Sequence, residues 1–283
     1  MAELASEFEQ HRRYLWSIAY RMLGSASDAE DIVQEAYLRA RNVPADDVGA
    51  ARAYLSTIIT RLCLDHWKSA RVRREEYVGP WLPEPIATHE QAEHVDVSSI
   101  SLAFMVLLES LSPLERAAYL LREVFDYEFG ELAPILGRNE AACRQLVHRA
   151  KAHLTAERPR FAPDREAHAR LLLQFGAACA RGDLGALEEL LTEDVRATSD
   201  GGGKVHAATR PLVGRTQVAK LYLAIFKAGS KVEHSMAMET INGLPCLVAR
   251  IGDQVRAVID IETDGVRIAS IRAVVNPDKL RFS

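Results

Sequence analysis

Residues 129–154, FGELAPILGRNEAACRQLVHRAKAHL, contain two helical patterns separated by a short turn. Gly137 follows the first apolar run, and glycine often ends a helix because it adopts positive φ without a steric penalty. Asn139 precedes the second run, where an asparagine side chain can cap the first backbone N–H groups of a helix. Two helices joined by such a turn have the layout of a helix-turn-helix.

The second helix of this pair has two different faces. We expect one face to be buried, and it consists of Cys143, Leu146, Val147, Ala150 and Leu154. The opposite face carries Ala141, Arg144, Gln145 and His148, with Arg149 and Lys151 at its edges. Arginine and glutamine can form paired hydrogen bonds with base edges, so this face suits the major groove of DNA. A helical hairpin without a DNA role is the alternative.

Residues 28–41, DAEDIVQEAYLRAR, form a second amphipathic pattern. The predicted buried face consists of Ile32, Val33, Ala36, Tyr37 and Ala40. The opposite face carries Asp31, Gln34, Glu35 and Leu38. An exposed leucine among acidic residues suits docking on a basic partner surface, and a plain solvated helix is the alternative.

Residues 53–75 combine an apolar stripe with basic and aromatic side chains. These are Arg61, His66, Trp67, Lys68, Arg71, Arg73 and Arg74. Such a mixture can hold a phosphate backbone and stack on an unpaired base. In the alternative, Trp67 belongs to the core and the arginines solvate a helix end.

The composition is that of a soluble globular protein with two or three domains. The chain has 283 residues and a net charge of −4, and its basic residues concentrate in segments 52–74 and 138–160. Neither a signal peptide nor a run of about 20 apolar residues is present, so we expect a cytoplasmic protein that does not enter a membrane. The four cysteines show no metal-ligand spacing, and we expect them to be buried.

The C-terminal part has a different pattern. Residues 78–85 hold three prolines around Trp81, which predicts an extended linker. Helical patterns at 166–180, 184–191 and 215–227 precede alternating residues from Val232 onwards. Asn242-Gly243 and Asp264-Gly265 are typical of hairpin turns, so we expect an α+β domain.

Together these segments resemble a known family. DAEDIVQEAYLRA resembles the polymerase-binding helix of sigma region 2, RLCLDHWKSARVRRE resembles its −10 reading segment, and residues 111–154 resemble sigma region 4. The motifs WLPEP (81–85), DGGGK (200–204) and NPDKL (276–280) resemble those of extracytoplasmic-function (ECF) sigma factors fused to a SnoaL-like domain. The resemblance implies a multidomain protein: two all-α sigma domains, the region 2 bundle and the region 4 helix-turn-helix, followed by an α+β SnoaL-like (NTF2-like) domain with a curved sheet. The expected segments are 1–76 (region 2), 77–98 (linker), 99–158 (region 4) and 164–283 (SnoaL-like).

The resemblance also implies roles for individual residues. Core polymerase binding is expected of Asp28, Asp31, Gln34, Glu35 and Leu38. Together with the pattern of residues 53–75, it implies −10 contacts by Arg61, Asp65, Trp67, Lys68, Arg71, Arg73 and Arg74. Contacts to the −35 element are expected of Arg144, Gln145, His148, Arg149 and Lys151. Leu62 stands where many relatives have a polar residue, and Leu146 stands where region 4 often has arginine.

The three C-terminal motifs are expected to regulate the sigma domains within the same chain. They comprise Trp81, Leu82, Pro83, Glu84, Pro85, Asp200, Gly201, Gly202, Gly203, Lys204, Asn276, Pro277, Asp278, Lys279 and Leu280. Candidates for acid–base chemistry are Asp200, Lys204, His206, His234 and Asp260, but no pattern brings two of them together, so we expect no catalytic residue, metal or cofactor. The resulting hypothesis is a sigma factor that binds core RNA polymerase and promoter DNA. The alternative is a DNA-binding regulator fused to a SnoaL-like enzyme or small-molecule sensor.

Overall fold

The computed structural model describes residues 4–41, 43, 50–88, 99–157, 165–230 and 232–282, without the side chains of residues 69–75 and 156–157. The chain divides into two compact units. The first consists of Met1–Glu75 and Met105–Arg158, and the second of Glu76–Phe104 and Pro159–Ser283. The predicted linker therefore belongs to the same unit as the C-terminal domain. Among the described helices, none combines the length and hydropathy needed to span a membrane.

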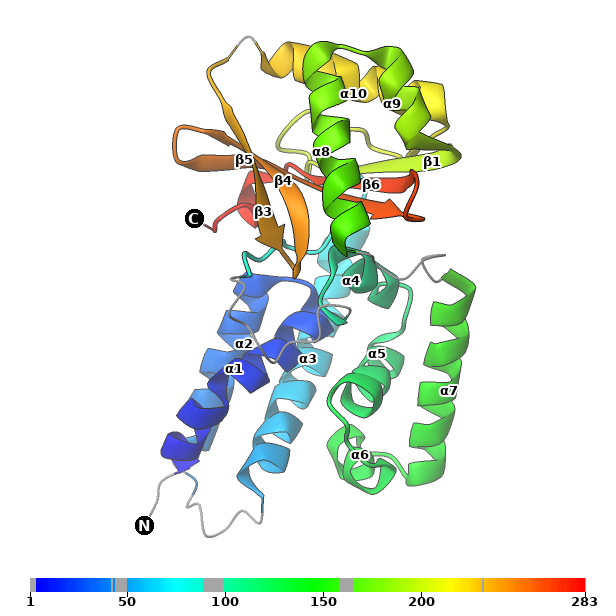
Figure 1. Cartoon of the computed structure of the whole chain (residues 1–283). Coiled ribbons are helices and arrows are strands. Elements are labelled where there is room, and N and C mark those ends of the chain that lie inside the picture. Colours follow the sequence, from blue (N-terminus) through cyan, green and yellow to red (C-terminus); the bar gives the residue numbers. More distant parts are fainter. Residues whose placement is uncertain are drawn as a thin grey trace. The chain divides into compact units, whose positions relative to one another are not determined.

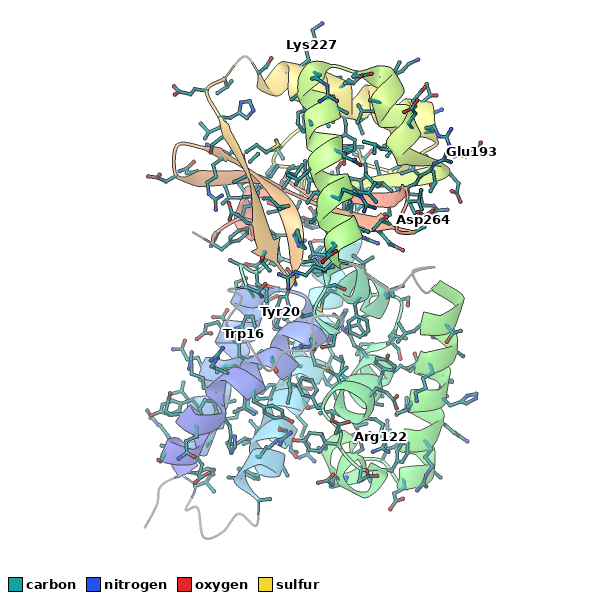
Figure 2. The ribbon with its side chains drawn as sticks, viewed as in Figure 1. Trp16, Tyr20, Arg122, Glu193, Lys227 and Asp264 are labelled. Carbon is teal, nitrogen blue, oxygen red and sulfur yellow. The ribbon has the colours of Figure 1, made fainter. Side chains whose placement is uncertain are left out.

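The first unit is helical (Figure 1). Its helices are α1 (Leu4–Leu23), α2 (Ala26–Ala40), α3 (Ala51–Glu75), α5 (Pro113–Tyr119), the π-helix η3 (Leu120–Val124), α6 (Phe129–Leu136) and α7 (Glu140–Glu157), and α4 (Leu102–Leu108) enters it from residue 105. Trp16 and Tyr20 stack one turn apart on α1, with ring centroids 5.1 Å apart (Figure 2). Ser112 and Glu115 form a capping box at the start of α5, and Pro113 lies in the first turn, where its missing N–H costs nothing.

The second unit contains one six-stranded sheet. Its strands are β1 (Leu191–Asp200), β2 (Leu212–Val213), β3 (Ser235–Ile241), β4 (Leu244–Ile251), β5 (Gln254–Thr263) and β6 (Ile268–Val274), in the order β2-β1-β6-β5-β4-β3. Strands β1 and β6 run parallel, and the other neighbours are antiparallel. Asn242 and Gly243 both adopt positive φ in the β3–β4 turn, which confirms this hairpin.

Three helices pack on one face of the sheet. They are α8 (Arg165–Arg181), α9 (Leu184–Leu190) and α10 (Arg215–Gly229), and Figure 1 shows them together beside the strands. Phe175 and Tyr222 fill the space between these helices and the sheet, where their rings meet edge to face at 5.1 Å. The short helix η4 (Pro277–Lys279) follows β6 and brings the C-terminal motif back to the end of β1.

Candidate nucleic-acid interface and linker contacts

The predicted helix-turn-helix is present. Helix α6 ends at Gly137, whose φ of 62° is left-handed, and the side chain of Asn139 accepts the N–H of Ala142 at 2.8 Å. The face of α7 predicted to be buried is buried, whereas the polar face is exposed. The buried residues are Cys143, Leu146, Val147, Ala150 and Leu154. Leu146, the residue that departs from the region 4 pattern, thus packs on the buried side of α7.

The cations of the exposed face lie beside carboxylates. Arg144 contacts Glu140 at 2.7 Å, and its guanidinium lies over the ring of Phe129 at 5.0 Å. Lys151 contacts Glu123 at 2.7 Å. The side chains of Arg144 and Lys151 are more than half exposed, so their ion pairs are weak and can be exchanged for phosphates at little cost. His148 and Gln145 are exposed on the same face.

Arg149 has a second role in the structure. It donates to Glu115 at 2.9 Å, which ties α7 to the capping box of α5. Burial disfavours the charge of Glu115, yet hydrogen bonds from Ser112 and Arg149 outweigh this effect and hold its pKa below the usual value. Arg149 therefore ties the second helix of the helix-turn-helix to α5 as well as presenting a positive charge.

The predicted polymerase-binding face on α2 is exposed. Asp31, Gln34 and Glu35 are accessible, and Leu38 is 45% exposed. The opposite face, which includes Ile32, Val33, Ala36 and Ala40, is buried as predicted. Asp28 differs from the others because it is half-buried and its carboxylate lies 3.4 Å from His66.

On α3 the −10 candidates divide into exposed and buried residues. Asp65 and Lys68 are exposed and pair with each other at 2.7 Å. Trp67 is only 8% exposed, and its indole N–H donates to the carbonyl of Met22 at 3.0 Å. It follows Ile59 and Cys63 at four-residue intervals on the buried face, so it belongs to the core and cannot stack on a base in this conformation. The side chains of Arg71, Arg73 and Arg74 lie outside the described residues.

Arg61, the remaining −10 candidate, already has protein partners. Its guanidinium donates to the carbonyl of Pro134 at 2.8 Å and to that of Ile135 at 3.4 Å. Both carbonyls lie in the last turn of α6, where helices leave carbonyls without intrahelical partners. In this structure Arg61 therefore stabilises a helix end of the helix-turn-helix.

The linker packs on the C-terminal domain through Asp200, at the end of β1. This carboxylate is fully buried, and its Oδ2 accepts the Leu82 N–H at 2.8 Å and the Lys279 ammonium at 2.7 Å. The other oxygen accepts the Tyr77 hydroxyl. Lys279 also donates to the carbonyl of Leu82, and it lies 4.0 Å from the centroid of the Trp81 ring. We call Asp200, Asn276 and Lys279 the linker-binding cluster.

The glycines of DGGGK allow this close approach. A Cβ atom on Gly202 would lie 2.3 Å from the Asn276 amide and 2.9 Å from the Tyr77 hydroxyl. A Cβ on Gly203 would lie 3.1 Å from Val78. Asn276 donates to the Tyr77 hydroxyl at 2.7 Å, and Lys204 pairs with Asp278. The motifs WLPEP, DGGGK and NPDKL thus meet in one place within the second unit.

A second linker contact involves the β3–β4 turn. Asn242 is fully buried and exchanges two hydrogen bonds with Ile86, at 2.9 and 3.0 Å. Its side chain also donates to the carbonyl of Ile100 at 2.8 Å. The sequence predicted the turn at Asn242 but not its contact with the linker. Tyr77, which precedes WLPEP, was not predicted as a contact either, because a single tyrosine carries no pattern.

The candidates for acid–base chemistry have separate partners. Asp200 pairs with Lys279, whereas Asp260 pairs with Arg272 at 3.1 Å. Burial raises the pKa of Asp260, and the charge of Arg272 partly offsets this. His206 and His234 are exposed. Within the described part of the chain, no group of three or more His, Cys, Asp or Glu side chains could hold a metal ion.

Comparison with known proteins agrees with this organisation. Residues 8–73 match the Sigma-70 region 2 family and residues 101–154 match Sigma-70 region 4. The ECF RNA polymerase sigma factor SigJ of Mycobacterium tuberculosis is 38% identical over 98% of this chain and 93% of its own length. The chain belongs to the ECF RNA polymerase sigma factors.

Other comparisons extend over the C-terminal domain of this sigma factor. The probable ECF sigma factor SigI of Mycobacterium tuberculosis is 29% identical over 98% of this chain and 94% of its own length. The crystal structure of SigJ superposes with a TM-score of 0.75 at 34% identity, covering 97% of each chain. Two helical sigma domains followed by an α+β domain are thus the architecture of the protein, as the sequence predicted. Its sigma domains imply binding to core RNA polymerase and promoter DNA.

Proposed function

We propose that the C-terminal domain of this sigma factor regulates promoter-directed initiation by holding the linker between regions 2 and 4. The observation that carries this proposal is the buried contact of Asp200 and Lys279 with the backbone of Leu82. A buried ion pair costs desolvation and contributes little net stability, so its position on the linker backbone favours a role in specificity or switching. We assign the domain no catalytic step, and we place the protein in the cytoplasm with the polymerase.

Linker docking can control initiation through geometry. Each residue of extended chain adds about 3.3 to 3.6 Å of reach, so residues held on the C-terminal domain cannot contribute to the distance between regions 2 and 4. Because the domain is tethered, its effective concentration is in the millimolar range and a weak contact suffices. We infer that release of the linker allows regions 2 and 4 to separate and to contact both promoter elements.

Residue roles follow from exposure and chemistry. We assign core polymerase binding to Asp31, Gln34, Glu35 and Leu38, with Asp28 supporting them, and promoter contacts to the exposed cations of α7. On α3 we keep Arg61, Asp65, Lys68, Arg71, Arg73 and Arg74 as −10 contacts and omit Trp67, because it is buried. We also propose the domain bounds expected from the sequence. These are 1–76 for region 2, 77–98 for the linker, 99–158 for region 4 and 164–283 for the SnoaL-like domain.

Run-off transcription with purified core polymerase tests the proposal. We would compare the full chain, a chain ending before Asn276, and a chain ending near residue 160. We expect the amount of run-off transcript from the same promoter to differ between the two shortened proteins and the full chain. Equal initiation and equal affinity for core polymerase would make the C-terminal domain a passive passenger. If none of the three directs initiation, the alternative of a DNA-binding regulator fused to an enzyme or sensor gains support.

A further inference from the structure

Two arginines connect region 2 to region 4 within the first unit, each by capping a helix of the other region. Arg61 on α3 of region 2 donates to the last-turn carbonyls of α6 in region 4. Arg116 on α5 of region 4 donates to the carbonyl of Arg21, in the last turn of α1 in region 2, at 2.8 Å. A cation at a helix C-terminus also interacts favourably with the helix dipole.

Arg116 is an unusual residue for such a contact because it is fully buried. One guanidinium nitrogen pairs with Glu109 at 2.6 Å, and the group lies 5.6 Å from the centroid of the Trp67 ring. Its second terminal nitrogen is buried without a hydrogen-bond partner. An incompletely satisfied buried charge contributes less to stability than a fully paired one, so this contact is suited to opening.

A chain of hydroxyl groups links the same two regions. Tyr14 on α1 donates to Tyr127 at 3.1 Å, and Tyr127 donates to Ser56 on α3 at 2.7 Å. The guanidinium of Arg52 lies over the Tyr14 ring at 4.2 Å. Tyr127 follows the π-helix η3 and Asp126, whose φ is 57°. Both are uncommon backbone conformations that often mark functional sites, and here they precede the residue that contacts region 2.

We infer that Arg61, Arg116 and the Tyr127 hydroxyl together hold regions 2 and 4 closed, and that Arg61 cannot contact promoter DNA until the α6 cap is broken. The inference rests on the −10 role proposed above for Arg61. Its guanidinium has one set of donors, and those donors are directed at the carbonyls of Pro134 and Ile135. The cap on α6 and the −10 strand therefore compete for the same group.

The test measures separation of the two regions in the full chain without polymerase. Spin labels on Gln10→Cys in α1 and Ala152→Cys in α7 report the distance, because both positions are exposed and all four native cysteines are buried. Tyr127→Phe removes the bonds to Tyr14 and Ser56 with little change in volume, and Arg116→Lys keeps the charge but removes the Nε donor. Tyr54→Phe, on the exposed side of α3, is the matched control.

We expect a narrow label distance in the wild-type and Tyr54→Phe proteins and a broader, longer one in Tyr127→Phe and Arg116→Lys. An unchanged distance in Tyr127→Phe overturns the inference, whatever the stability of Arg116→Lys. Binding of a single-stranded oligonucleotide with the −10 element of a promoter that this protein uses should tighten at least about fivefold in Tyr127→Phe, because two hydrogen bonds are lost and each contributes a net factor of at least about two.

The gain in oligonucleotide binding should disappear when Tyr127→Phe is combined with Arg61→Gln. Two results would contradict competition between the α6 cap and DNA for Arg61. One is tighter oligonucleotide binding that persists in the Tyr127→Phe/Arg61→Gln variant, and the other is unchanged binding by Tyr127→Phe despite a longer label distance. If the linker proposal is wrong, the full chain and the shortened chains should give equal run-off initiation. That outcome does not alter the label distances, so the two failures are distinguishable.

Discussion

The ammonium group of Lys279 lies 2.7 Å from the buried carboxylate of Asp200, and both contact the backbone of Leu82 in the linker. Residues far apart in the sequence thus form one linker-binding cluster. Because the pair is buried, loss of one charge leaves the other without compensation. This relationship connects the fold of the C-terminal domain to the control of the sigma domains.

Lys279→Met should therefore destabilise the second unit by about 3 kcal/mol, because an uncompensated buried carboxylate remains at Asp200. Asp200→Asn together with Lys279→Met should cost less than the sum of the single changes, since neither charge is then left alone. Urea denaturation of the wild type, the two single variants and the double variant measures this coupling. Additive losses would argue against a direct buried pair.

Gly202→Ala should displace the linker. The new methyl group would lie within 2.9 Å of Asn276 and Tyr77, and the residue has a φ of 58°. Gly252→Ala is the matched control, because its φ is nearly the same, at 57°, but its Cβ would have open space. The control should lose about 1 kcal/mol from backbone strain alone, and Gly202→Ala should lose clearly more. Equal losses in thermal unfolding would contradict the packing described for the glycine motif.

Arg144→Ala should weaken recognition of the −35 element selectively. Loss of a base-reading arginine costs about 1 to 3 kcal/mol of discrimination, whereas loss of a phosphate contact at Arg74 should weaken all sequences and lower the salt slope by about 1. Competition binding of holoenzyme to matched and altered promoters measures both effects. Equal losses on both promoters for Arg144→Ala would exclude a base-reading role.

Substitution of Leu38 and Asp31 to alanine should abolish co-purification with core polymerase while the fold stays intact. Both side chains lie on the exposed face of α2, so their removal leaves no cavity. Leu173→Ala, which removes another exposed leucine on α8, is the control and should bind core polymerase normally. Undiminished binding by the double variant would refute the assignment of this face.

Acid should weaken the contact between α5 and α7. The pKa of Glu115 is lowered in the folded protein, so its contribution to stability is complete above its ordinary value of 4.5 and is lost as the pH falls through the lower folded value. Urea denaturation of wild-type and Glu115→Gln proteins should differ at pH 7 and converge as the pH falls below about 4. A constant difference across this range would contradict the role of the carboxylate.

The sequence predicted the turns whose backbone conformation is determined by the residues within them. Gly137 and Asn139 marked the helix-turn-helix, and Asn242-Gly243 marked a hairpin, because the backbone conformations concerned have few alternatives. Strand β1 was not predicted, since its sequence LTEDVRATSD follows α9 directly and is rich in polar residues. Its parallel partner β6 is distant in the chain, and such pairing leaves no local pattern.

The contacts of individual site residues were less predictable. Trp67 was assigned to DNA by its basic neighbours, although its spacing from Ile59 and Cys63 places it in the core. The partners of Arg61 are backbone carbonyls, which every residue has and no sequence motif identifies. The motif resemblance identified Asp200 and Lys279, but their joint contact with Leu82 depends on the tertiary fold.

The most direct test of linker control compares run-off initiation by wild-type, Lys279→Met and Lys227→Met proteins with purified core polymerase. Lys227 is an exposed lysine on α10 (Figure 2) and serves as the matched control. Release of the linker should raise initiation by Lys279→Met at least about threefold, a difference of roughly 0.65 kcal/mol. Lys227→Met should match the wild type. Equal or lower initiation by Lys279→Met, with normal affinity for core polymerase, would contradict control by linker docking.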